Sequence, residues 1–316
     1  MGIGRISNER NLMAFPGKVK IVEVGPRDGL QNEKRIVPLE VKVEFIERLG
    51  EVGIGAMEAG SFVSPKWIPQ MANTKDVFAR ISRRPGVKYS ALIPNIRGFE
   101  QALAAKADEV AIFSAATESF SQKNINCSIA ESLNRFRPVA AAAMSVGIPL
   151  RGYISCGLGC PYEGEVSVES VANVAATLEA MGCYEISLGD TIGTGTPLKA
   201  RAMVEATLEH VPLSKIAIHF HDTYGQALAN ILACLELGVS VIDSSIAGLG
   251  GCPYAKGASG NVATEDVIYM LEGMGIETGV DLKKLHAVGQ FISEYLGRPS
   301  ASKVATVFCQ NGQASR

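Results

Sequence analysis

The stretch Lys215-Ile216-Ala217-Ile218-His219-Phe220-His221-Asp222 is a short apolar run that ends in two histidines and an aspartate. Its composition predicts an extended strand, in which successive side chains point to opposite faces. His219 and His221 therefore share one face, and two imidazoles on one face form half of a metal site. A hydrogen-bonded pair of core histidines explains the same two residues equally well, because neutral histidine is also common in protein cores.

Runs of this kind recur along the chain and alternate with longer helical patterns, as in βα units around a parallel sheet. The predicted strands are Val19–Val24, Ile54–Ala59, Lys88–Ile93, Glu109–Phe113, Leu150–Ser155, Tyr184–Leu188, Ile216–Phe220 and Val241–Ser245. The predicted helices are Leu39–Leu49, Ile96–Ala105, Ile129–Ser145, Val168–Met181, Leu198–His210, Ala227–Leu237 and Thr264–Met274. Eight such units without a linker favour a (β/α)₈ TIM barrel over a doubly wound sheet.

The predicted domain organisation is a single catalytic barrel with short flanking segments. Residues 1–18 form an N-terminal extension, and residues 19–297 form the barrel together with an outer C-terminal helix, Leu282–Leu296. The tail, residues 298–316, is expected to be an irregular cap with little order.

Composition and charge exclude several classes of protein. The chain has 316 residues, 47% of them hydrophobic, and a formal net charge of −2, which favours neither nucleic acid nor an anionic membrane as a partner. Seven cysteines at scattered positions do not suggest a disulfide scaffold, so a reducing, cytoplasmic location is expected. The N-terminus lacks a secretory signal pattern, and the longest apolar stretch, Val139–Leu150, is too short to span a bilayer.

Polar and glycine-rich segments follow five of the predicted strands. Because the carboxyl ends of barrel strands carry the chemistry, these segments should meet at one mouth. Any one of them could be an ordinary turn, but five together favour a functional site. The residues concerned are Arg27, Asp28 and Gln31 after strand 1, Glu58 and Ser61 at strand 2, Asp190 after strand 6, His221 after strand 7, and Gly248–Asn261 after strand 8.

The motifs Gly25–Lys34, Ser61–Met71, His219–Asn230 and Gly248–Asn261 carry a resemblance to a known family. From about Lys18 to about Gly297 the chain resembles the 3-hydroxy-3-methylglutaryl-CoA (HMG-CoA) lyases, within the metal-dependent lyase and Claisen-type TIM barrels. The resemblance implies that Mg²⁺ or Mn²⁺ is bound by Asp28, His219, His221 and Asn261. It also implies that Arg27 is catalytic, that Cys252 is a reactive loop thiol, and that Glu58 and Asp190 are polar neighbours of the site.

The residue types support this chemistry. Two imidazoles, a carboxylate and an amide oxygen suit six-coordinate Mg²⁺ or Mn²⁺ better than tetrahedral Zn²⁺. Arg27, next to the ligand Asp28, can stabilise the thioester enolate that forms when a carbon–carbon bond breaks, although a structural ion pair with Glu58 is the alternative. Cys252 can return a proton to that enolate. The loop with Gly248, Gly250, Gly251, Lys256, Gly257 and Gly260 is expected to be a lid over the thioester.

The activity implied by the resemblance is cleavage of HMG-CoA to acetyl-CoA and acetoacetate, a step of leucine degradation. The implied partner is an acyl-CoA thioester, and a homodimer or higher homo-oligomer is expected. Alternatives are a lyase for longer 3-alkyl substrates, a Claisen-type synthase, a Schiff-base aldolase using Lys88, and a non-catalytic metal-binding barrel. Cys309, near the C-terminus, is expected to be an exposed thiol that could bridge two subunits and, if the tail lies near the barrel mouth, hinder access to it; an inert terminal thiol is the alternative.

Overall fold

The computed structural model describes residues 15–251 and 260–314, with side chains described to residue 310. Its eight strands are β1 (Lys20–Glu23), β2 (Ala56–Ser61), β3 (Lys88–Leu92), β4 (Glu109–Ala115), β5 (Leu150–Ser155), β6 (Glu185–Asp190), β7 (Ile216–Phe220) and β8 (Val241–Ser244). The helices are α1 (Leu39–Glu51), α2 (Thr74–Arg80), α3 (Ile96–Ala104), α4 (Glu118–Ile125), α5 (Ile129–Val146), α6 (Val168–Ala180), α7 (Pro197–Leu208), α8 (Ala227–Leu235), α9 (Thr264–Gly273), α10 (Leu282–Leu296) and α11 (Lys303–Ala314).

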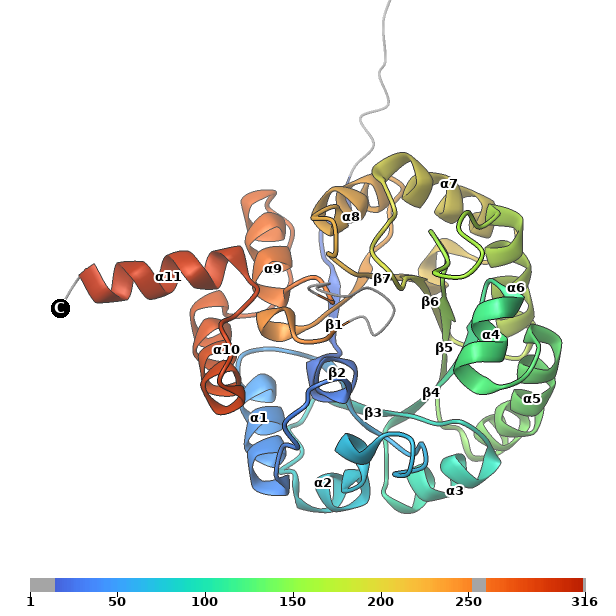
Figure 1. The fold of residues 1–316 in the computed structure, drawn as a ribbon, viewed down its shortest axis with the longest axis horizontal. Coiled ribbons are helices and arrows are strands. Elements are labelled where there is room, and N and C mark those ends of the chain that lie inside the picture. Colours follow the sequence, from blue (N-terminus) through green and yellow to red (C-terminus); the bar gives the residue numbers. More distant parts are fainter. Residues whose placement is uncertain (1–14, 252–259, 315–316) are drawn as a thin grey trace, which may run out of the picture.

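The strands form a closed parallel barrel surrounded by helices, as Figure 1 shows. Closure comes from β1, which pairs with β2 through Val22 and Ala56 and with β8 through Ile21 and Ile242. Because all strands run in one direction, their carboxyl ends open at the same end of the barrel. The predicted (β/α)₈ TIM barrel is confirmed, and each of its eight strands overlaps its predicted range.

Two apolar regions support the barrel. The larger region lies between the strands and the surrounding helices and includes Phe45, Leu49 and Ile112. Inside the barrel, the small residues Val22, Ala56, Ala217 and Val241 form a separate cluster near the amino ends of the strands. Together with the buried pair of Arg151 and Glu185, these small side chains fill the narrow interior below the mouth.

Helix boundaries follow from capping residues that the sequence displays. α5 begins at a capping box in which Ser128 Oγ accepts from Glu131 N and the Glu131 carboxylate accepts from Ser128 N. α10 begins after Asp281, whose carboxylate accepts from two backbone N–H groups, and it ends at Gly297, where φ is +69°. These caps explain why the predicted range Leu282–Leu296 is confirmed at both ends.

Three helices were not predicted. α2 and α4 have only 7 and 8 residues, too short to give a clear apolar period. The third, α11, occupies most of the tail, so the prediction of an irregular cap was wrong. Asp266 of α9 holds its first turn, because the carboxylate accepts from Ser302 Oγ at 2.6 Å and from Val304 N at 3.0 Å.

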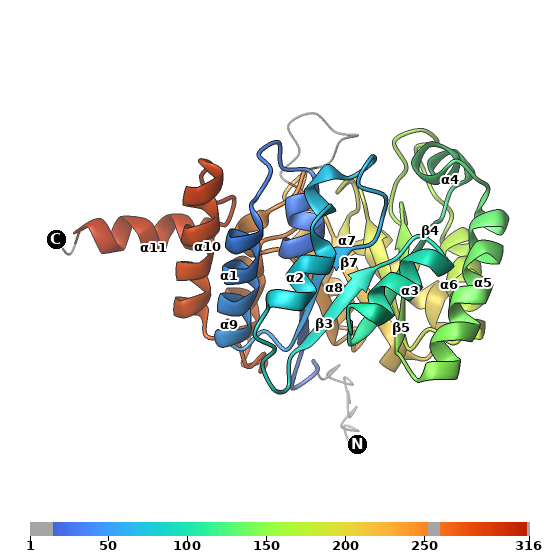
Figure 2. The ribbon, with the colours of Figure 1, turned by 90° about the horizontal axis from the view of Figure 1, so that it is seen from below.

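The position of α11 bears on the prediction for Cys309. The helix packs against α9 and α10 and then projects away from the barrel wall, rather than over the mouth (Figures 1 and 2). Cys309 is exposed, as expected, and its sulfur accepts from Gln290 Nε2 at 3.3 Å. Bridging of two subunits through this thiol stays a prediction, but obstruction of the barrel mouth by it does not fit this arrangement.

Across the described ranges, none of the helices has both the length and the apolar composition needed to cross a membrane.

Candidate active site

Arg27 and Asp28 lie in one π-helical turn, η1 (Gly25–Gly29), directly after β1. Arg27 Nε donates to Oε2 of the buried Glu58 at 2.5 Å, and Arg27 Nη1 donates to Asp28 Oδ1 at 2.7 Å. Burial disfavours the charged guanidinium, but the two carboxylates outweigh this effect and raise the pKa of Arg27. Arg27 is therefore a fixed cation in a site with little water.

Asp28 and the two histidines converge from β1 and β7, the two strands that flank β8 in the closed barrel. His219 lies in β7 and His221 follows directly after it, and the rings have centroids 5.5 Å apart. One ligand atom from each of Asp28, His219 and His221 lies within 4.8 Å of the others. Burial acts against ionisation of Asp28, but Arg27 and the histidines lower its pKa to about 2. Burial and His219 lower the pKa of His221 to about 4, so its imidazole is neutral at neutral pH.

Asn261 joins this group from the segment after β8. Its backbone forms a bridge with His221, and its side-chain Nδ2 donates to Asp28 Oδ2 at 2.7 Å. In this orientation the amide contributes a hydrogen bond to Asp28. Binding a cation through Asn261 Oδ1 requires the opposite orientation of the amide.

The donor set fits a divalent cation. An ionised Asp28 and a neutral His221 are in the protonation states that ligands need. His221 Nδ1 is buried and has no hydrogen-bond partner among the described residues, which is costly unless a ligand completes it. His219 presents Nε2 toward Asp28 Oδ2 at 4.0 Å, a separation that a shared cation can bridge.

A buried charge network beneath the site orients His219. Asp243 of β8 accepts from Arg151 Nη1 at 3.0 Å and from Arg151 Nη2 at 2.7 Å, and its Oδ2 lies 3.3 Å from His219 Nδ1. Arg151 of β5 also donates through Nε to Glu185 at 2.7 Å. Because an ionised Asp243 can only accept a hydrogen bond, it favours a proton on His219 Nδ1 and leaves the lone pair on Nε2, the atom that faces Asp28.

The sequence analysis missed Asp243 and Arg151, although the chain carries a signal for them. Both are charged residues in the middle of strands that are otherwise buried, Val241–Ser244 and Leu150–Ser155. A charge in such a position must be paired, and a barrel interior is where partners from several strands meet. The pairing itself could not be foreseen, because the two residues are 92 positions apart.

The structure divides the other polar residues predicted at the mouth into two groups. Gln31 lines the cavity, and Glu58 holds Arg27. Ser61 instead accepts from Val63 N at 3.2 Å, and Asp190 accepts from Gly195 N at 2.8 Å and Thr194 N at 3.2 Å. These last two residues shape loops around the site and are not among the residues that line the cavity.

The two ends of the predicted lid segment are close together. At Gly260 a Cβ atom would lie 2.6 Å from the carbonyl carbon of Gly250, and φ is +80° at Gly260 and +126° at Gly250. Only glycine allows this approach and these angles. Gly248 and Gly251 lie on the same described stem, whereas Cys252, Lys256 and Gly257 lie outside the described residues.

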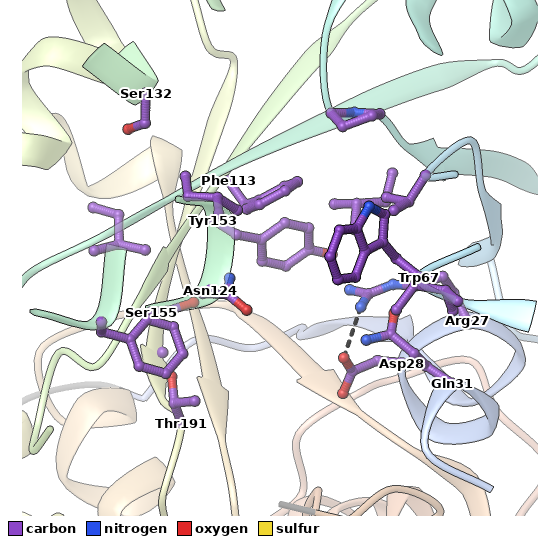
Figure 3. Close-up of a pocket in the computed structure, with 18 of the residues that line it drawn as sticks. Arg27, Asp28, Gln31, Trp67, Phe113, Asn124, Ser132, Tyr153, Ser155 and Thr191 are labelled. Atoms are coloured by element: carbon purple, nitrogen blue, oxygen red, sulfur yellow. Dashed lines mark hydrogen bonds and ion pairs between the residues drawn. The ribbon is translucent and has the colours of Figure 1, made fainter. Parts of the chain in front are cut away.

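A cavity of about 620 Å³ opens above these groups. Arg27, Asp28, His219 and His221 line its polar part. Tyr153, Phe113 and Trp67 form an apolar wall beside the Arg27–Asp28 pair in Figure 3. These three aromatic residues were not predicted, because Phe113 and Tyr153 lie in buried strands and Trp67 in the segment after β2, where an aromatic residue is most often part of a core.

Lys88, the candidate for a Schiff base, is exposed at the first residue of β3. The amino end of a strand is the end of the barrel opposite the mouth, so this amine cannot reach a substrate bound near Arg27. A Schiff-base aldolase using Lys88 is therefore excluded.

A closed (β/α)₈ barrel with a buried arginine and a candidate cation site at its mouth defines the class of TIM-barrel enzymes that work on charged small molecules with a divalent metal. Within that class the chain belongs to the HMGL-like family, whose sequence profile matches residues 18–292.

Individual relatives agree with this assignment. The chain is 59% identical over 306 residues to the rat protein "Hydroxymethylglutaryl-CoA lyase, mitochondrial", covering 97% of this chain and 94% of the rat protein. A crystal structure of hydroxymethylglutaryl-CoA lyase from Pseudomonas aeruginosa has a TM-score of 0.92 and 56% identity, covering 94% of this chain and 99% of that chain. An HMG-CoA lyase from Acinetobacter baumannii in complex with coenzyme A and 3-methylmalate has a TM-score of 0.88 and 35% identity, covering 93% and 96%.

The name of the rat relative places that protein in mitochondria. The cytoplasmic location expected for this chain therefore stays a prediction, as does its assembly into a homodimer or higher homo-oligomer.

Proposed function

We propose that this protein cleaves HMG-CoA to acetyl-CoA and acetoacetate with the help of Mg²⁺ or Mn²⁺. The observation that carries the proposal is the fixed Arg27 cation beside the Asp28, His219 and His221 cluster, whose ligand atoms lie within 4.8 Å of one another. The identity of 59% to a hydroxymethylglutaryl-CoA lyase over 97% of this chain supports the choice of substrate.

Asp28, His219 and His221 would hold the cation, with Asn261 as the fourth protein ligand once its amide oxygen faces the site. A divalent cation bound there supplies a Lewis acid that lowers the pKa of a coordinated tertiary hydroxyl group. Asp243 keeps the His219 ring in its position, and Arg27 restrains one carboxylate oxygen of Asp28 at 2.7 Å. The protein thus prepares the ligands before the substrate binds.

Arg27 would act on the charge that forms during cleavage. When the C3 hydroxyl loses its proton, its oxygen becomes the ketone of acetoacetate and the C2–C3 bond breaks. The electron pair of that bond moves onto the thioester as an enolate, which then takes a proton at C2 to give acetyl-CoA. The guanidinium is held by Glu58 and Asp28, so it can meet the enolate oxygen without reorganising.

We propose Cys252 as the donor of that proton and the segment from Gly248 to Gly260 as a lid. Both proposals rest on the residue types and on the family resemblance, since residues 252–259 lie outside the described part of the chain. What supports a lid is its stem, where Gly260 O accepts from Asp222 N at 2.8 Å and Leu249 O accepts from Asn261 Nδ2 at 3.2 Å.

The test is an assay of the full-length protein with HMG-CoA. We expect acetoacetate and acetyl-CoA in equal amounts, loss of activity with excess chelator, and recovery with Mg²⁺ or Mn²⁺. A folded protein that releases neither product with either metal would contradict the proposal. Thioesters with longer 3-alkyl groups test the alternative substrate, which a higher kcat/KM on the longer chains would favour.

A further inference from the structure

Trp67 is the single tryptophan of the chain, and 82% of its surface is exposed. An indole is one of the largest apolar groups in proteins and normally buries most of its surface. Trp67 nevertheless lines the cavity, and its ring points toward the space beside Arg27 and Tyr153 in Figure 3. An apolar surface of this size at the rim of a polar site is available to a ligand.

The backbone around Trp67 is a closed turn. Ser64 O accepts from Trp67 N at 2.9 Å and from Ile68 N at 3.1 Å, and Met71 N donates to Ile68 O at 3.0 Å. The indole is therefore held out by an ordered turn, and its exposure does not come from an unstructured segment.

Buried polar side chains fasten this turn to the segment after β1. Gln70 Oε1 accepts from Val37 N at 2.9 Å, and Gln70 Nε2 donates to Arg35 O at 3.0 Å. Lys42 of α1 donates to Gln70 O and, at 2.9 Å, to Asn73 Oδ1. A position fixed in this way costs little additional ordering when a ligand binds.

Depth within the cavity separates two parts of the site. Arg27 and Tyr153 are only 7% and 9% exposed, so they lie at the bottom of the cavity, whereas the exposed Trp67 lies at its rim. In the proposed reaction Arg27 meets the thioester oxygen, and the acyl group occupies the floor. The sulfur is bonded to the same carbon as that oxygen, so the chain beyond the sulfur must leave toward the solvent from beside Arg27.

We infer that Trp67 binds the pantetheine arm of the acyl-CoA substrate as it leaves the barrel. The arm consists of methylene and amide groups, which pack against an indole face without needing a charged partner. This inference rests on the proposed function. It adds a binding residue for the coenzyme A part of the substrate, distinct from the groups that act on the acyl part.

Fluorescence of the single tryptophan tests the contact directly. The wild-type protein is titrated with coenzyme A, which carries no acyl group to cleave, and then with free 3-hydroxy-3-methylglutarate. We expect a saturable change in Trp67 emission with coenzyme A and none with the free acid. Trp67→Phe, which has no tryptophan, reports any contribution from tyrosine.

Kinetics with HMG-CoA provide a second readout. We expect Trp67→Ala to raise KM about tenfold with kcat within about twofold, as for an interaction made equally in the ground and transition states. Trp67→Phe should keep most of the affinity because an aromatic face remains. Tyr269→Ala is the matched control, because Tyr269 is an aromatic residue that is 62% exposed and is not part of the cavity lining.

Emission unchanged at saturating coenzyme A, or a Trp67→Ala variant with wild-type KM, would overturn the inference. If the wild-type protein cleaves HMG-CoA but its tryptophan emission does not change with coenzyme A, the role of Trp67 is refuted and the proposed function is unaffected. A wild-type protein that fails to cleave HMG-CoA but shows saturable quenching would refute the function and support the contact. Melting temperatures of the variants verify folding.

Discussion

At the scale of single residues, Asp28 contacts both the catalytic arginine and the candidate metal ligands. Its carboxylate accepts from Arg27 and from Asn261 and lies 4.0 Å from His219 Nε2. These partners lower its pKa to about 2, although burial alone would raise it. Asp28 therefore stays ionised throughout the neutral pH range, as a metal ligand must.

Removing a ligand should weaken metal binding and catalysis together. We expect His219→Ala or Asp28→Ala to lower Mn²⁺ affinity about tenfold or more, with a parallel loss of activity. Electron paramagnetic resonance of free Mn²⁺ measures the affinity. His210→Ala, an exposed histidine outside the site, is the control. Full activity of either variant at micromolar metal would contradict the assignment of these ligands.

Replacing Arg27 should affect the chemical step most strongly. We expect Arg27→Gln to lower kcat by about 10²-fold or more, because the enolate charge exists mainly in the transition state. Arg80→Gln, which removes an exposed ion pair with Glu40, should leave kcat near the wild-type value. An increase in KM at unchanged kcat would mean that Arg27 serves only to bind the substrate.

Asp243 should act through the tautomer of His219. In Asp243→Asn, an amide N–H facing His219 Nδ1 favours a proton on Nε2, which then cannot bind a cation. We expect Mn²⁺ affinity to fall about tenfold or more in calorimetry. Ser187→Ala removes another donor to Asp243, at 2.8 Å, without changing the carboxylate, and should have little effect. Native affinity in a well-folded Asp243→Asn protein would refute this role.

At the scale of elements, α11 depends on a cap from a neighbouring helix. Asp266 accepts from Ser302 Oγ, from Lys303 N at 3.1 Å and from Val304 N at 3.0 Å. Two N–H groups in the first turn of α11 thus donate to a carboxylate on α9. A carboxylate at a helix N-terminus also complements the helix dipole.

Loss of this cap should release α11 and leave the barrel folded. We expect Asp266→Ala to increase amide hydrogen exchange over residues 303–310, because an N-cap contributes about 1 kcal/mol. Asp281→Ala, which removes the cap of α10 instead, should increase exchange in that helix and serves as the matched control. Unchanged exchange at residues 303–310 in Asp266→Ala would show that packing alone holds α11.

At the scale of the whole molecule, two buried glutamates join the first and last parts of the barrel. Glu23 of β1 accepts from Ile246 N at 2.9 Å and from Thr264 Oγ1 at 2.7 Å. Glu265 of α9 accepts from Ala247 N at 2.9 Å and thereby holds a residue whose φ is +56°. Burial raises the pKa of Glu23 to about 7 and that of Glu265 to about 8.

These raised pKa values predict how stability depends on pH. Between about pH 4.5, the ordinary glutamate value, and about pH 8, the folded protein holds protons that the unfolded chain has lost. Unfolding then releases protons, so the free energy of unfolding falls as pH rises through this range. The contribution is complete below about pH 4.5 and is lost above the folded pKa values.

Urea denaturation at about pH 6 and about pH 9 measures the difference. We expect wild type to be more stable at the lower pH, and Glu265→Gln to show a smaller difference because its amide does not titrate. Glu272→Gln, at an exposed position of the same helix, is the control. An equal pH dependence in wild type and Glu265→Gln would refute the contribution of Glu265.

Local patterns along the chain were enough to predict most of the fold. The barrel strands lie in short apolar runs, many of them β-branched, and α10 lies between Asp281 and Gly297, which are strong caps. The candidate ligands were also accessible to sequence reasoning. Asp28 and His221 follow a predicted strand and His219 is next to the last residue of one, and parallel strands bring such positions to one mouth.

The remaining features depend on contacts that no local pattern encodes. α11 is capped by Asp266, 36 residues before Ser302, so its sequence alone gave no clear helix start. Asp243 reaches Arg151 across the barrel, and Gln70 supports the turn of Trp67 by bonds to residues more than 30 positions away. The sequence by itself determined the barrel and the position of its polar mouth, because strand and turn propensities act over a few residues. Only the tertiary structure decided which buried charges pair and which aromatic residue stays exposed, because burial is a property of the packed molecule.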